Sequence, residues 1–432
     1  MSIKWRIQLS IYMLLVILLT LSCRSTKHLL TQQIIASETL LNQHVGFCLY
    51  DLEAHQMVTT YKPNQYFVPA SNIKLYTFLH SLSTLEDSIP TFRYVEKGDS
   101  LILWGCGDPS FLHPDLILQN EKIFNFLLHT PKQIFLVQEK QQPTFWAKGW
   151  QWDDYNNRYQ TELNLLPIYG NIVQFQTDSI SQQIITRPRY FESLLQTDSS
   201  RFTANGNIQR DFYTNLFYTS ASKNATKQQI PFKTSLTLTA KLLTDTLKKT
   251  VNIITYQLPE QTKTLYGVAT DSLYKKMLVE SDNLIAEQLL IISNIHQNKH
   301  FSNTINKGTL TYLPQPYKWA DGSGLSRLNL TTPLNTIVVL DSIYHKIGRE
   351  RIKALFANGG VSGTLKNMYK DYPTFVFAKT GSMQGIYNQS GYVISAQGKW
   401  YAFSYLNNNF VESGEKVRQQ VEKIIRWIHH NF

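Results

Sequence analysis

Apolar and polar residues alternate in two neighbouring runs near the start of the chain. These runs, Val45 to Tyr50 and Met57 to Tyr61, flank a polar segment at residues 51–56. Alternation with a period of two is typical of half-buried strands, so this part predicts a β-hairpin. The next segment instead has apolar residues at helical spacing, namely Leu75, Phe78, Leu79, Leu82 and Leu85. A buried helix is therefore predicted over residues 75–85.

The C-terminal part of the chain predicts helices followed by strands. Apolar residues recur at helical spacing over residues 271–294 and 333–347. Three strand-like runs follow, at Thr374–Ala378, Gly391–Ser395 and Trp400–Tyr405. A short turn at residues 396–398 joins the last two as a hairpin. The closing segment predicts an amphipathic helix whose apolar face consists of Val417, Val421, Ile424, Ile425 and Ile428.

Between these parts lies a long stretch, from about residue 90 to about residue 260. It contains short runs of Tyr, Phe, Thr and Ile, polar turns and few long helical patterns, so we expect a mostly β insertion. A chain of 432 residues exceeds what one core usually serves, and 43% hydrophobic residues suffice to bury more than one. Two or more domains are therefore expected.

The first residues have the layout of a bacterial export signal. Lys4 and Arg6 precede an apolar run over residues 7–21, which is too short for a comfortable transmembrane helix. Residues 1–22 are therefore interpreted as the signal, and Cys23 after a small residue resembles a lipoprotein processing site. Thr20 stands where such sites usually have leucine, so plain cleavage is the alternative. With lipidation, an N-terminal lipid would hold the protein on a membrane.

Net charge and cysteine content indicate which compartment and which kinds of partner the protein has. The formal charge falls from +11 to +9 when the signal leaves with two basic residues and no acid. Outside the cytoplasm, a basic surface suits anionic envelope polymers better than nucleic acid. Cys48 and Cys106 allow one disulfide, but both lie in strand-like apolar runs, which favours buried free thiols. None of the eleven histidines falls in a paired metal-ligand motif, so we expect no metal or other cofactor.

Ser71 and Lys74 form a candidate catalytic pair at the start of the helix predicted over residues 75–85. Residues three apart share a helix face, so the amine can lie beside the hydroxyl and activate it as a nucleophile. The Ser-x-x-Lys pattern alone is weak, because it also occurs at Ser220, Ser272 and Ser413. Only Ser71 combines a proline two residues earlier with an apolar helix behind it. A capping serine and a solvated lysine would be the structural alternative.

Two further motifs favour catalysis. Ser281-Asp282-Asn283 opens a turn within a helical stretch, and Lys379-Thr380-Gly381-Ser382 is expected to end the strand Thr374–Ala378. Ser-x-x-Lys, Ser-Asp-Asn and Lys-Thr-Gly, in this order, are the active-site set of penicillin-interacting serine enzymes.

With these motifs, the sequence resembles the class C low-molecular-mass penicillin-binding proteins, the D-alanyl-D-alanine carboxypeptidase and endopeptidase family. The resemblance covers most of the chain after the signal. Four additional stretches carry it, at residues 107–109, 149–155, 321–327 and 391–393.

The resemblance implies an α/β (α+β) fold of the penicillin-binding, serine β-lactamase-like kind. A five-stranded antiparallel sheet flanked by helices would be assembled from residues 28–90 and 262–432. Residues 91–261 would form the inserted region, since this family carries large insertions there.

The resemblance also implies roles for the motif residues. Lys74, desolvated and repelled by Lys379, would take the proton of Ser71, and Ser281 would relay a proton to the leaving D-alanine nitrogen. The oxyanion hole would consist of the backbone N–H groups of Ser71 and Ser382. The substrate-binding residues that the resemblance implies are Asn283, Lys379, Thr380, Gly381 and Ser382.

The expected function is hydrolysis of D-alanyl-D-alanine bonds in peptidoglycan stem peptides, through an acyl-enzyme that penicillin and other β-lactams would also form. The expected location is the bacterial periplasm or cell envelope. The sequence leaves open the balance between carboxypeptidase and endopeptidase activity, the diamino acid of the substrate and the oligomeric state.

Other functions were weighed against this one. A class A β-lactamase has a deacylating glutamate after its Ser-Asp-Asn motif, but the similar run Glu162-Leu163-Asn164 precedes Ser281 here. A β-lactamase or esterase is therefore disfavoured. A catalytically silent envelope protein that binds peptidoglycan is the other alternative, although no motif residue is lost. The aromatic residues Trp150, Trp152 and Tyr155 suit stacking on glycan, but packing beneath a loop is favoured.

Overall fold

The computed structural model describes most of the chain. The described residues are 26–116, 121–201, 208–220, 227–297, 310–370 and 373–432. The expected export signal and Cys23 lie outside them. Within the described residues, no helix combines the length and the apolar character needed to cross a membrane.

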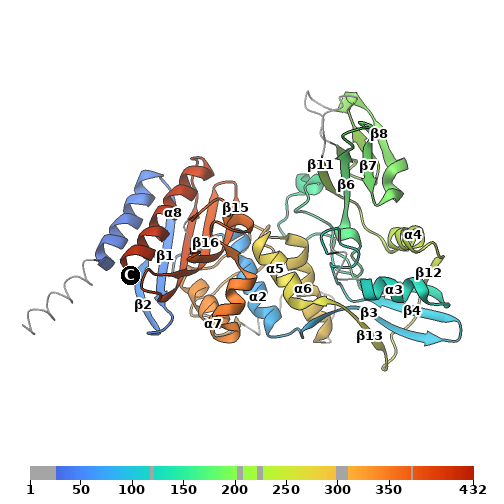
Figure 1. The fold of residues 1–432 in the computed structure, drawn as a ribbon, viewed down its shortest axis with the longest axis horizontal. Coiled ribbons are helices and arrows are strands. Elements are labelled where there is room, and N and C mark those ends of the chain that lie inside the picture. Colours follow the sequence, from blue (N-terminus) through green and yellow to red (C-terminus); the bar gives the residue numbers. More distant parts are fainter. Residues whose placement is uncertain (1–25, 117–120, 202–207, 221–226, 298–309, 371–372) are drawn as a thin grey trace, which may run out of the picture.

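A six-stranded antiparallel sheet with the order β14-β15-β16-β17-β1-β2 forms the centre of one lobe (Figure 1). Its strands are β1 His44–Asp51, β2 Gln56–Tyr61, β14 Ala357–Asn358, β15 Val376–Met383, β16 Ile386–Ile394 and β17 Trp400–Asn408. The N-terminal part of the chain supplies β1 and β2, and the C-terminal part supplies the others. The predicted five-stranded antiparallel sheet is confirmed, with the two-residue strand β14 added at one edge.

Strand β15 extends further than the sequence predicted. It runs through the Lys-Thr-Gly motif, pairing Lys379 with Ser390 and Ser382 with Tyr387 on β16. The expectation that the strand ends before Lys379 was therefore wrong. The apolar pattern stops at the motif, but the main-chain ladder continues because it does not depend on side-chain polarity.

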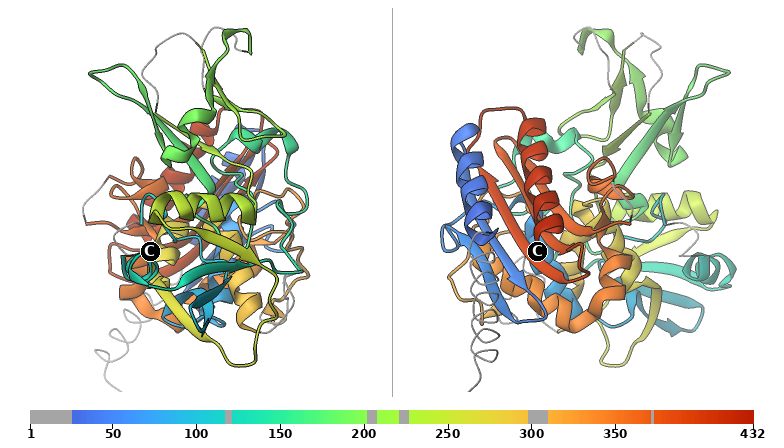
Figure 2. Two further views of the ribbon diagram at one scale, coloured as in Figure 1. Left: turned by 90° about the vertical axis from the view of Figure 1, so that its right-hand side faces the viewer. Right: turned by 60° about the vertical axis from the view of Figure 1, so that its left-hand side comes forward.

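Helices cover both faces of this sheet. The helix at residues 26–40 and α8 (Gly414–Asn431) cover one face, side by side in Figure 2. On the other face lie α2 Lys74–Leu82, α5 Thr270–Val279, α6 Asn283–His296 and α7 Pro333–Leu355. Neighbouring residues of β1 point to opposite faces: Phe47 packs toward α8 and Cys48 toward α2. The five apolar residues predicted to line the closing helix are all fully buried.

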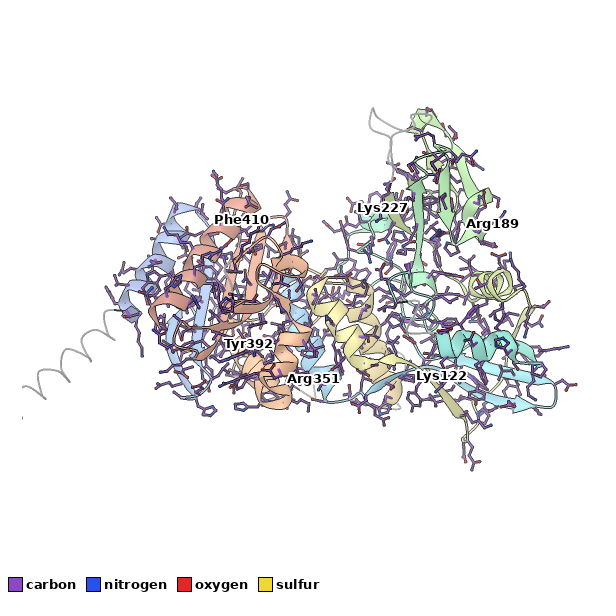
Figure 3. All side chains as sticks on the ribbon, in the orientation of Figure 1. Lys122, Arg189, Lys227, Arg351, Tyr392 and Phe410 are labelled. Carbon is purple, nitrogen blue, oxygen red and sulfur yellow. The ribbon has the colours of Figure 1, made fainter. Side chains whose placement is uncertain are left out.

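The predicted helices exist, but their ends differ. A 3₁₀ turn, η1 (Ala70–Ile73), carries Ser71, and α2 begins only at Lys74. The helical stretch predicted over residues 271–294 is two helices, interrupted where Ser281 adopts φ 64. Helix α7 continues past residue 347, with a kink at Gly348. Tyr392 of β16, labelled in Figure 3, is buried and donates a hydrogen bond of 2.8 Å to Leu340 O of α7.

The second lobe contains a mixed five-stranded sheet with the order β12-β5-β4-β3-β13 and two three-stranded sheets, β8-β10-β9 and β11-β6-β7. Short strands predominate, and two α-helices accompany them. The bounds are β3 Ser88–Lys97, β4 Ser100–Gly105, α3 Glu121–His129, β5 Gln133–Val137, β6 Ile172–Thr177, β7 Ile184–Arg187, β8 Leu195–Thr197, β9 Gln209–Arg210, β10 Phe217–Thr219, β11 Lys227–Pro231, α4 Leu236–Leu247, β12 Val251–Ile254 and β13 Lys263–Ala269.

Strands β3 and β13 carry the chain into and out of this lobe. They pair with each other in its five-stranded sheet, with Lys263 opposite Tyr94. The expected boundary at residue 90 therefore falls inside β3, and β13 follows the boundary at residue 262. We propose residues 88–269 as the inserted unit, because both strands belong to its sheet.

Cys48 and Cys106 are both buried free thiols, as the sequence favoured. Burial raises the pKa of each thiol, to about 12 for Cys106. Both thiols are therefore inert as nucleophiles near neutral pH.

Candidate active site

Ser71 and Lys74 lie side by side at the start of α2. Because the 3₁₀ turn leads directly into the helix, residues three apart share a face, and Lys74 Nζ lies 3.0 Å from Ser71 Oγ. Lys74 is fully buried, whereas Ser71 lines an open cleft of about 470 Å³. The pair predicted from the Ser-x-x-Lys spacing is therefore within hydrogen-bond distance.

Two further acceptors surround the Lys74 amine. Nζ donates hydrogen bonds of 2.6 Å to Asn283 Oδ1 and 2.6 Å to the main-chain oxygen of Ser323. With Ser71, these acceptors match the three N–H bonds of an ammonium group. A neutral amine would keep the bonds to Asn283 and Ser323 and turn its lone pair toward the Ser71 hydroxyl. The surroundings thus suit both protonation states of the lysine.

The pKa of Lys74 is lowered to about 8, because burial penalises its charge. The nearby carboxylates of Asp321, Glu287 and Asp282 partly oppose this effect. The expected repulsion by Lys379 is not among the causes of this shift, because burial alone lowers the pKa of Lys74. Repulsion acts instead on Lys379, whose pKa lies well below the usual value, first through burial and then through the charge on Lys74.

The Ser-Asp-Asn motif lies between α5 and α6. Ser281 has a left-handed backbone, and Asp282 caps α6 with its side chain. Ser281 Oγ accepts a hydrogen bond of 2.8 Å from Lys379 Nζ. Asn283 accepts a hydrogen bond from Lys74, and its Nδ2 donates one of 2.9 Å to the carbonyl of Tyr159 in the inserted lobe. The motif therefore links both lysines of the site and connects them to the insertion.

Strand β15 approaches the serine turn closely at Gly381. A Cβ atom at this position would lie 2.7 Å from Pro69 O and 2.9 Å from Ser71 N, so only glycine fits. Ser382, the next residue, lines the same cleft as Ser71. Thr380 is buried, and its carbonyl accepts a hydrogen bond of 2.7 Å from Lys379 Nζ. The strand therefore places a main-chain segment alongside Ser71.

Two buried acids that the sequence analysis did not single out hold the loop beneath Lys74. Glu287 of α6 accepts hydrogen bonds from Gly322 N at 3.1 Å and Ser323 N at 2.7 Å. Asp321 accepts from Gly324 N at 2.8 Å. The pKa of Glu287 is raised to about 8, by burial and then by the charge on Asp321. A glutamate inside an otherwise apolar helix is the sequence signal that would have identified it.

The inserted lobe contributes to the cleft. Its residues Gln151, Asp154 and Tyr159 line the cleft with Ser71 and Ser281. On the other side, the cleft is lined by Leu325, Arg327, Met383 and Gln384. Gln151 and Asp154 belong to residues 149–155, and Leu325 and Arg327 to residues 321–327, two of the stretches through which the sequence resembles the family. Tyr159, Met383 and Gln384 belong to no such stretch, so no sequence pattern selected them.

The aromatic residues near position 150 divide into two contacts. Trp150 Nε1 donates a hydrogen bond of 2.8 Å to Asp321 Oδ2, which connects the inserted lobe to the loop beneath Lys74. Trp152 and Tyr155 instead contact the ring of Phe212 edge-on. Trp152 remains 68% exposed.

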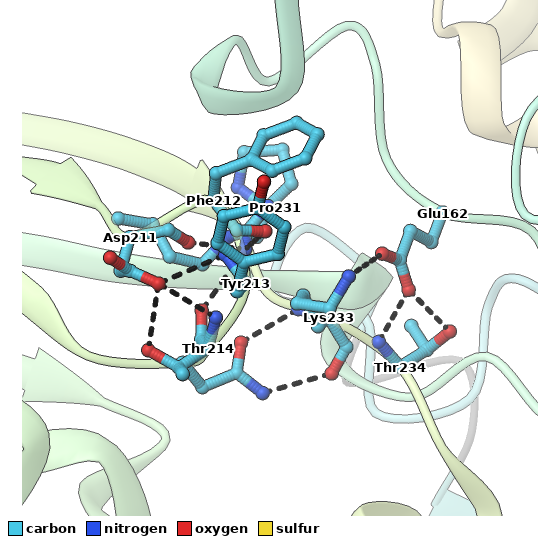
Figure 4. A network of polar contacts seen from close by, with 10 residues as sticks. Glu162, Asp211, Phe212, Tyr213, Thr214, Pro231, Lys233 and Thr234 are labelled. Carbon is cyan, nitrogen blue, oxygen red and sulfur yellow. Dashed lines mark hydrogen bonds and ion pairs between the residues drawn. The ribbon is translucent and has the colours of Figure 1, made fainter. Parts of the chain in front are cut away.

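Glu162, weighed as a deacylating residue, is bound within the insertion (Figure 4). Its Oε2 accepts hydrogen bonds of 2.6 Å from Thr234 N and 3.0 Å from Thr234 Oγ1, and Lys233 Nζ lies 3.4 Å from Oε1. The carboxylate is buried and does not line the cleft. The geometry thus agrees with its position before Ser281 in the chain, which disfavoured a β-lactamase.

The competing serine motifs have structural roles in the described part of the chain. Ser413 caps α8, accepting a hydrogen bond from the backbone N–H of Lys416 three residues later. Ser272 lies within α5. Lys223, the partner of Ser220 in another Ser-x-x-Lys pattern, lies outside the described residues.

Comparisons with known proteins agree on one family. The model of the D-Ala-D-Ala carboxypeptidase 3 (S13) family matches residues 30–430. The D-alanyl-D-alanine carboxypeptidase DacB of Haemophilus influenzae is 24% identical over 424 residues, covering 85% of this chain and 86% of the relative.

Solved structures show the same fold. Penicillin-binding protein 4 (dacB) from H. influenzae has a TM-score of 0.71 at 20% identity, covering 91% of this chain and 97% of that protein. Its complex with a novel β-lactam has a TM-score of 0.65 at 20% identity, covering 92% and 97%. The chain therefore belongs to the D-Ala-D-Ala carboxypeptidase 3 (S13) family and is a hydrolase of the class C low-molecular-mass penicillin-binding kind that its motifs predicted.

Proposed function

We propose that this protein hydrolyses D-alanyl-D-alanine bonds of peptidoglycan stem peptides through an acyl-enzyme on Ser71. The single observation that supports this most is the position of the buried Lys74 amine, 3.0 Å from the Ser71 hydroxyl that faces the cleft. Burial holds the pKa of Lys74 near 8, so a useful fraction of the amine is neutral near physiological pH.

In the acylation step, Lys74 accepts the Ser71 proton as Oγ attacks the carbonyl carbon of the penultimate D-alanine. The oxygen of that carbonyl becomes negative and is stabilised by the backbone N–H groups of Ser71 and Ser382. Losing one such donor typically costs about 3 kcal/mol of barrier. The close approach of β15 at Gly381 supports this arrangement.

Ser281 delivers a proton to the nitrogen of the leaving D-alanine. Its Oγ already accepts a hydrogen bond from Lys379 Nζ, so the hydroxyl proton is free to point into the cleft. The proton that Lys74 took from Ser71 passes to Ser281 and replaces the one that Ser281 donated, so Lys74 is neutral again. Water then attacks the acyl carbon, Lys74 accepts a proton from this water, and the proton goes to Ser71 Oγ as the ester bond breaks.

Substrate binding is assigned to Lys379, Thr380 and Asn283. The terminal carboxylate would sit near Lys379 and raise the lowered pKa of that lysine, because an opposite charge favours the ammonium form. Asn283 would bind a substrate amide, and Gly381 leaves main-chain room beside the nucleophile.

A β-lactam should acylate the same serine, since the relative from H. influenzae has been solved with one. We infer activity on terminal D-alanine, on cross-links, or on both, at the bacterial envelope, with Cys23 as the lipid attachment site.

The deciding experiment is intact-mass analysis after incubation with benzylpenicillin, followed by peptide mapping. One adduct on the peptide that contains Ser71 is expected, together with release of D-alanine from a stem pentapeptide. A Ser71→Ala variant that melts like wild type should give neither. An adduct on another residue, or undiminished release by Ser71→Ala, would overturn the proposal.

A further inference from the structure

Three side chains far from one another in the sequence meet at the edge of the first lobe. His55 comes from the turn between β1 and β2, while Asp341 and His345 come from α7. One ligand atom from each lies within 4.8 Å of the others. Asp341 and His345 are four residues apart and share a helix face, and the rings of His55 and His345 are stacked with centroids 5.3 Å apart.

Asp341 has an unsatisfied carboxylate oxygen. Its Oδ1 is buried and, among the described residues, no group donates a hydrogen bond to it. The only basic group of the described chain within 4 Å is His345, whose Nε2 lies 3.3 Å from Oδ1. A buried carboxylate oxygen without a donor is unfavourable unless a cation is nearby.

The neighbouring Arg349 does not supply a cation for Asp341. Arg349 follows one turn after His345, but its guanidinium binds Glu53 Oε1 at 2.6 Å and the Tyr344 hydroxyl at 2.7 Å. Its charge is therefore already balanced by Glu53, which leaves Asp341 facing two imidazoles.

Two imidazoles and a carboxylate are a ligand set typical of zinc. In a tetrahedral site with bonds of about 2.0–2.1 Å, neighbouring ligand atoms are about 3.3 Å apart, which matches the separation of His345 Nε2 and Asp341 Oδ1. Solvent reaches the exposed imidazoles, so water can take the fourth position.

We propose that His55, Asp341 and His345 bind one divalent metal ion of the zinc type. The ion would clamp the β1–β2 turn onto α7. None of the three residues lines the catalytic cleft, so this site is separate from the proposed chemistry and goes beyond it.

The test is a calorimetric titration of untagged, chelator-treated protein with Zn²⁺, compared among ligand variants. Suitable variants are His345→Ala and His55→Gly, because glycine accepts the left-handed backbone at residue 55, where φ is 52. His129→Ala removes an exposed imidazole of the inserted lobe and is the matched control.

Wild type and His129→Ala should bind one equivalent with the same affinity. Each ligand variant should bind more than about tenfold more weakly, since even outer-shell partners contribute 10–100-fold. Co²⁺ should give the visible absorption of a four-coordinate nitrogen and oxygen site in wild type and in His129→Ala, but not in the ligand variants. Melting curves without metal should agree among all variants, and only wild type and the control should melt higher with Zn²⁺.

Absence of saturable binding by wild type would overturn the proposal. So would equal affinity in wild type and in well-folded His345→Ala, which would mean that the metal binds elsewhere. If His345→Ala melts differently without metal, His55→Gly provides the same comparison from a surface turn.

Discussion

Glu287 Oε1 accepts a hydrogen bond of 2.7 Å from Ser323 N, and the carbonyl of the same serine accepts one of 2.6 Å from Lys74 Nζ. Glu287 on α6 therefore fixes Ser323, the residue whose carbonyl holds the proposed general base. Glu287 touches neither Ser71 nor, in the proposed mechanism, the substrate, so it acts as a positioning residue.

Glu287→Gln should weaken this support. Above the Glu287 pKa of about 8, where the side chain is ionised, one of the two backbone donors, Gly322 N or Ser323 N, would face the amide NH₂ and lose its acceptor, which costs about 1–3 kcal/mol. We expect a lower melting temperature and roughly tenfold slower acylation by penicillin, about 1.4 kcal/mol of barrier. The exposed Glu350→Gln is the matched control. Unchanged acylation and melting in Glu287→Gln would remove the positioning role.

The pH dependence of acylation should follow Lys74. In the proposed mechanism the neutral amine is the base, and its pKa is about 8, so the rate should rise almost tenfold from pH 6 to pH 7 and level off above about pH 8. Arginine cannot lose its proton in this range, so Lys74→Arg should acylate about 10²–10⁴-fold more slowly without that rise.

Lys379→Arg is the companion variant for this measurement. It keeps a cation for the substrate carboxylate and should be affected less than Lys74→Arg. Stopped-flow acylation rates across pH, with thermal melting as the folding control, give the ranking. Near wild-type acylation by well-folded Lys74→Arg would exclude Lys74 as the base.

Local patterns predicted the elements whose contacts lie close in sequence. The hairpin of β1 and β2 follows from an apolar period of two, and the apolar face of α8 follows from a period of 3.6. The Ser71–Lys74 pair follows from a spacing of three residues. The Lys-Thr-Gly segment was placed after its strand, because the apolar pattern stops where polar active-site residues begin.

Contacts between distant segments carried no local pattern. Glu287 of α6 holds the same loop that Asp321 holds from within, and His55 reaches His345 only after the sheet and α7 pack together. The Tyr159 carbonyl meets Asn283 only once the inserted lobe folds back on the cleft. Such contacts depend on tertiary packing, which a single sequence does not specify position by position.

Glu162→Gln should separate structure from deacylation. The amide oxygen can keep both hydrogen bonds from Thr234, but the amide nitrogen would face Lys233 Nζ, so losing this ion pair should destabilise the inserted lobe by about 1 kcal/mol. The lifetime of the penicillin adduct should not change, because Glu162 does not line the cleft. Intact-mass spectra recorded over hours give the lifetime. A markedly longer-lived adduct in Glu162→Gln would assign this residue to deacylation and favour a β-lactamase.

Cys23→Ala should test the proposed lipid anchor. If Cys23 carries a lipid, the wild-type protein should partition into detergent with membranes, whereas the variant should be released or remain unprocessed. Fractionation and the mass of the mature N-terminus measure both outcomes. Cys48→Ala is the control, because that thiol is buried within the sheet. Normal processing and membrane recovery of Cys23→Ala would contradict lipidation.

Gly381→Ala adds only a methyl group, but it should disturb the proposed oxyanion hole. The added methyl would lie 2.7 Å from Pro69 O and 2.9 Å from Ser71 N, both main-chain atoms that cannot rotate away. The strand must therefore move from the serine turn, which shifts the N–H groups of Ser71 and Ser382 relative to each other. Because the stabilisation of an oxyanion depends on donor distance, acylation should fall by about 10²-fold or more.

The matched control for this substitution is Gly414→Ala at the start of α8. Nothing lies within 4 Å of a Cβ atom there, so wild-type acylation and melting are expected. In Gly381→Ala, the acylation rate should fall much more than the melting temperature predicts, since the shift is local to the cleft. Equal acylation by Gly381→Ala and wild type would mean that the backbone N–H groups of β15 and the serine turn do not act together on the substrate.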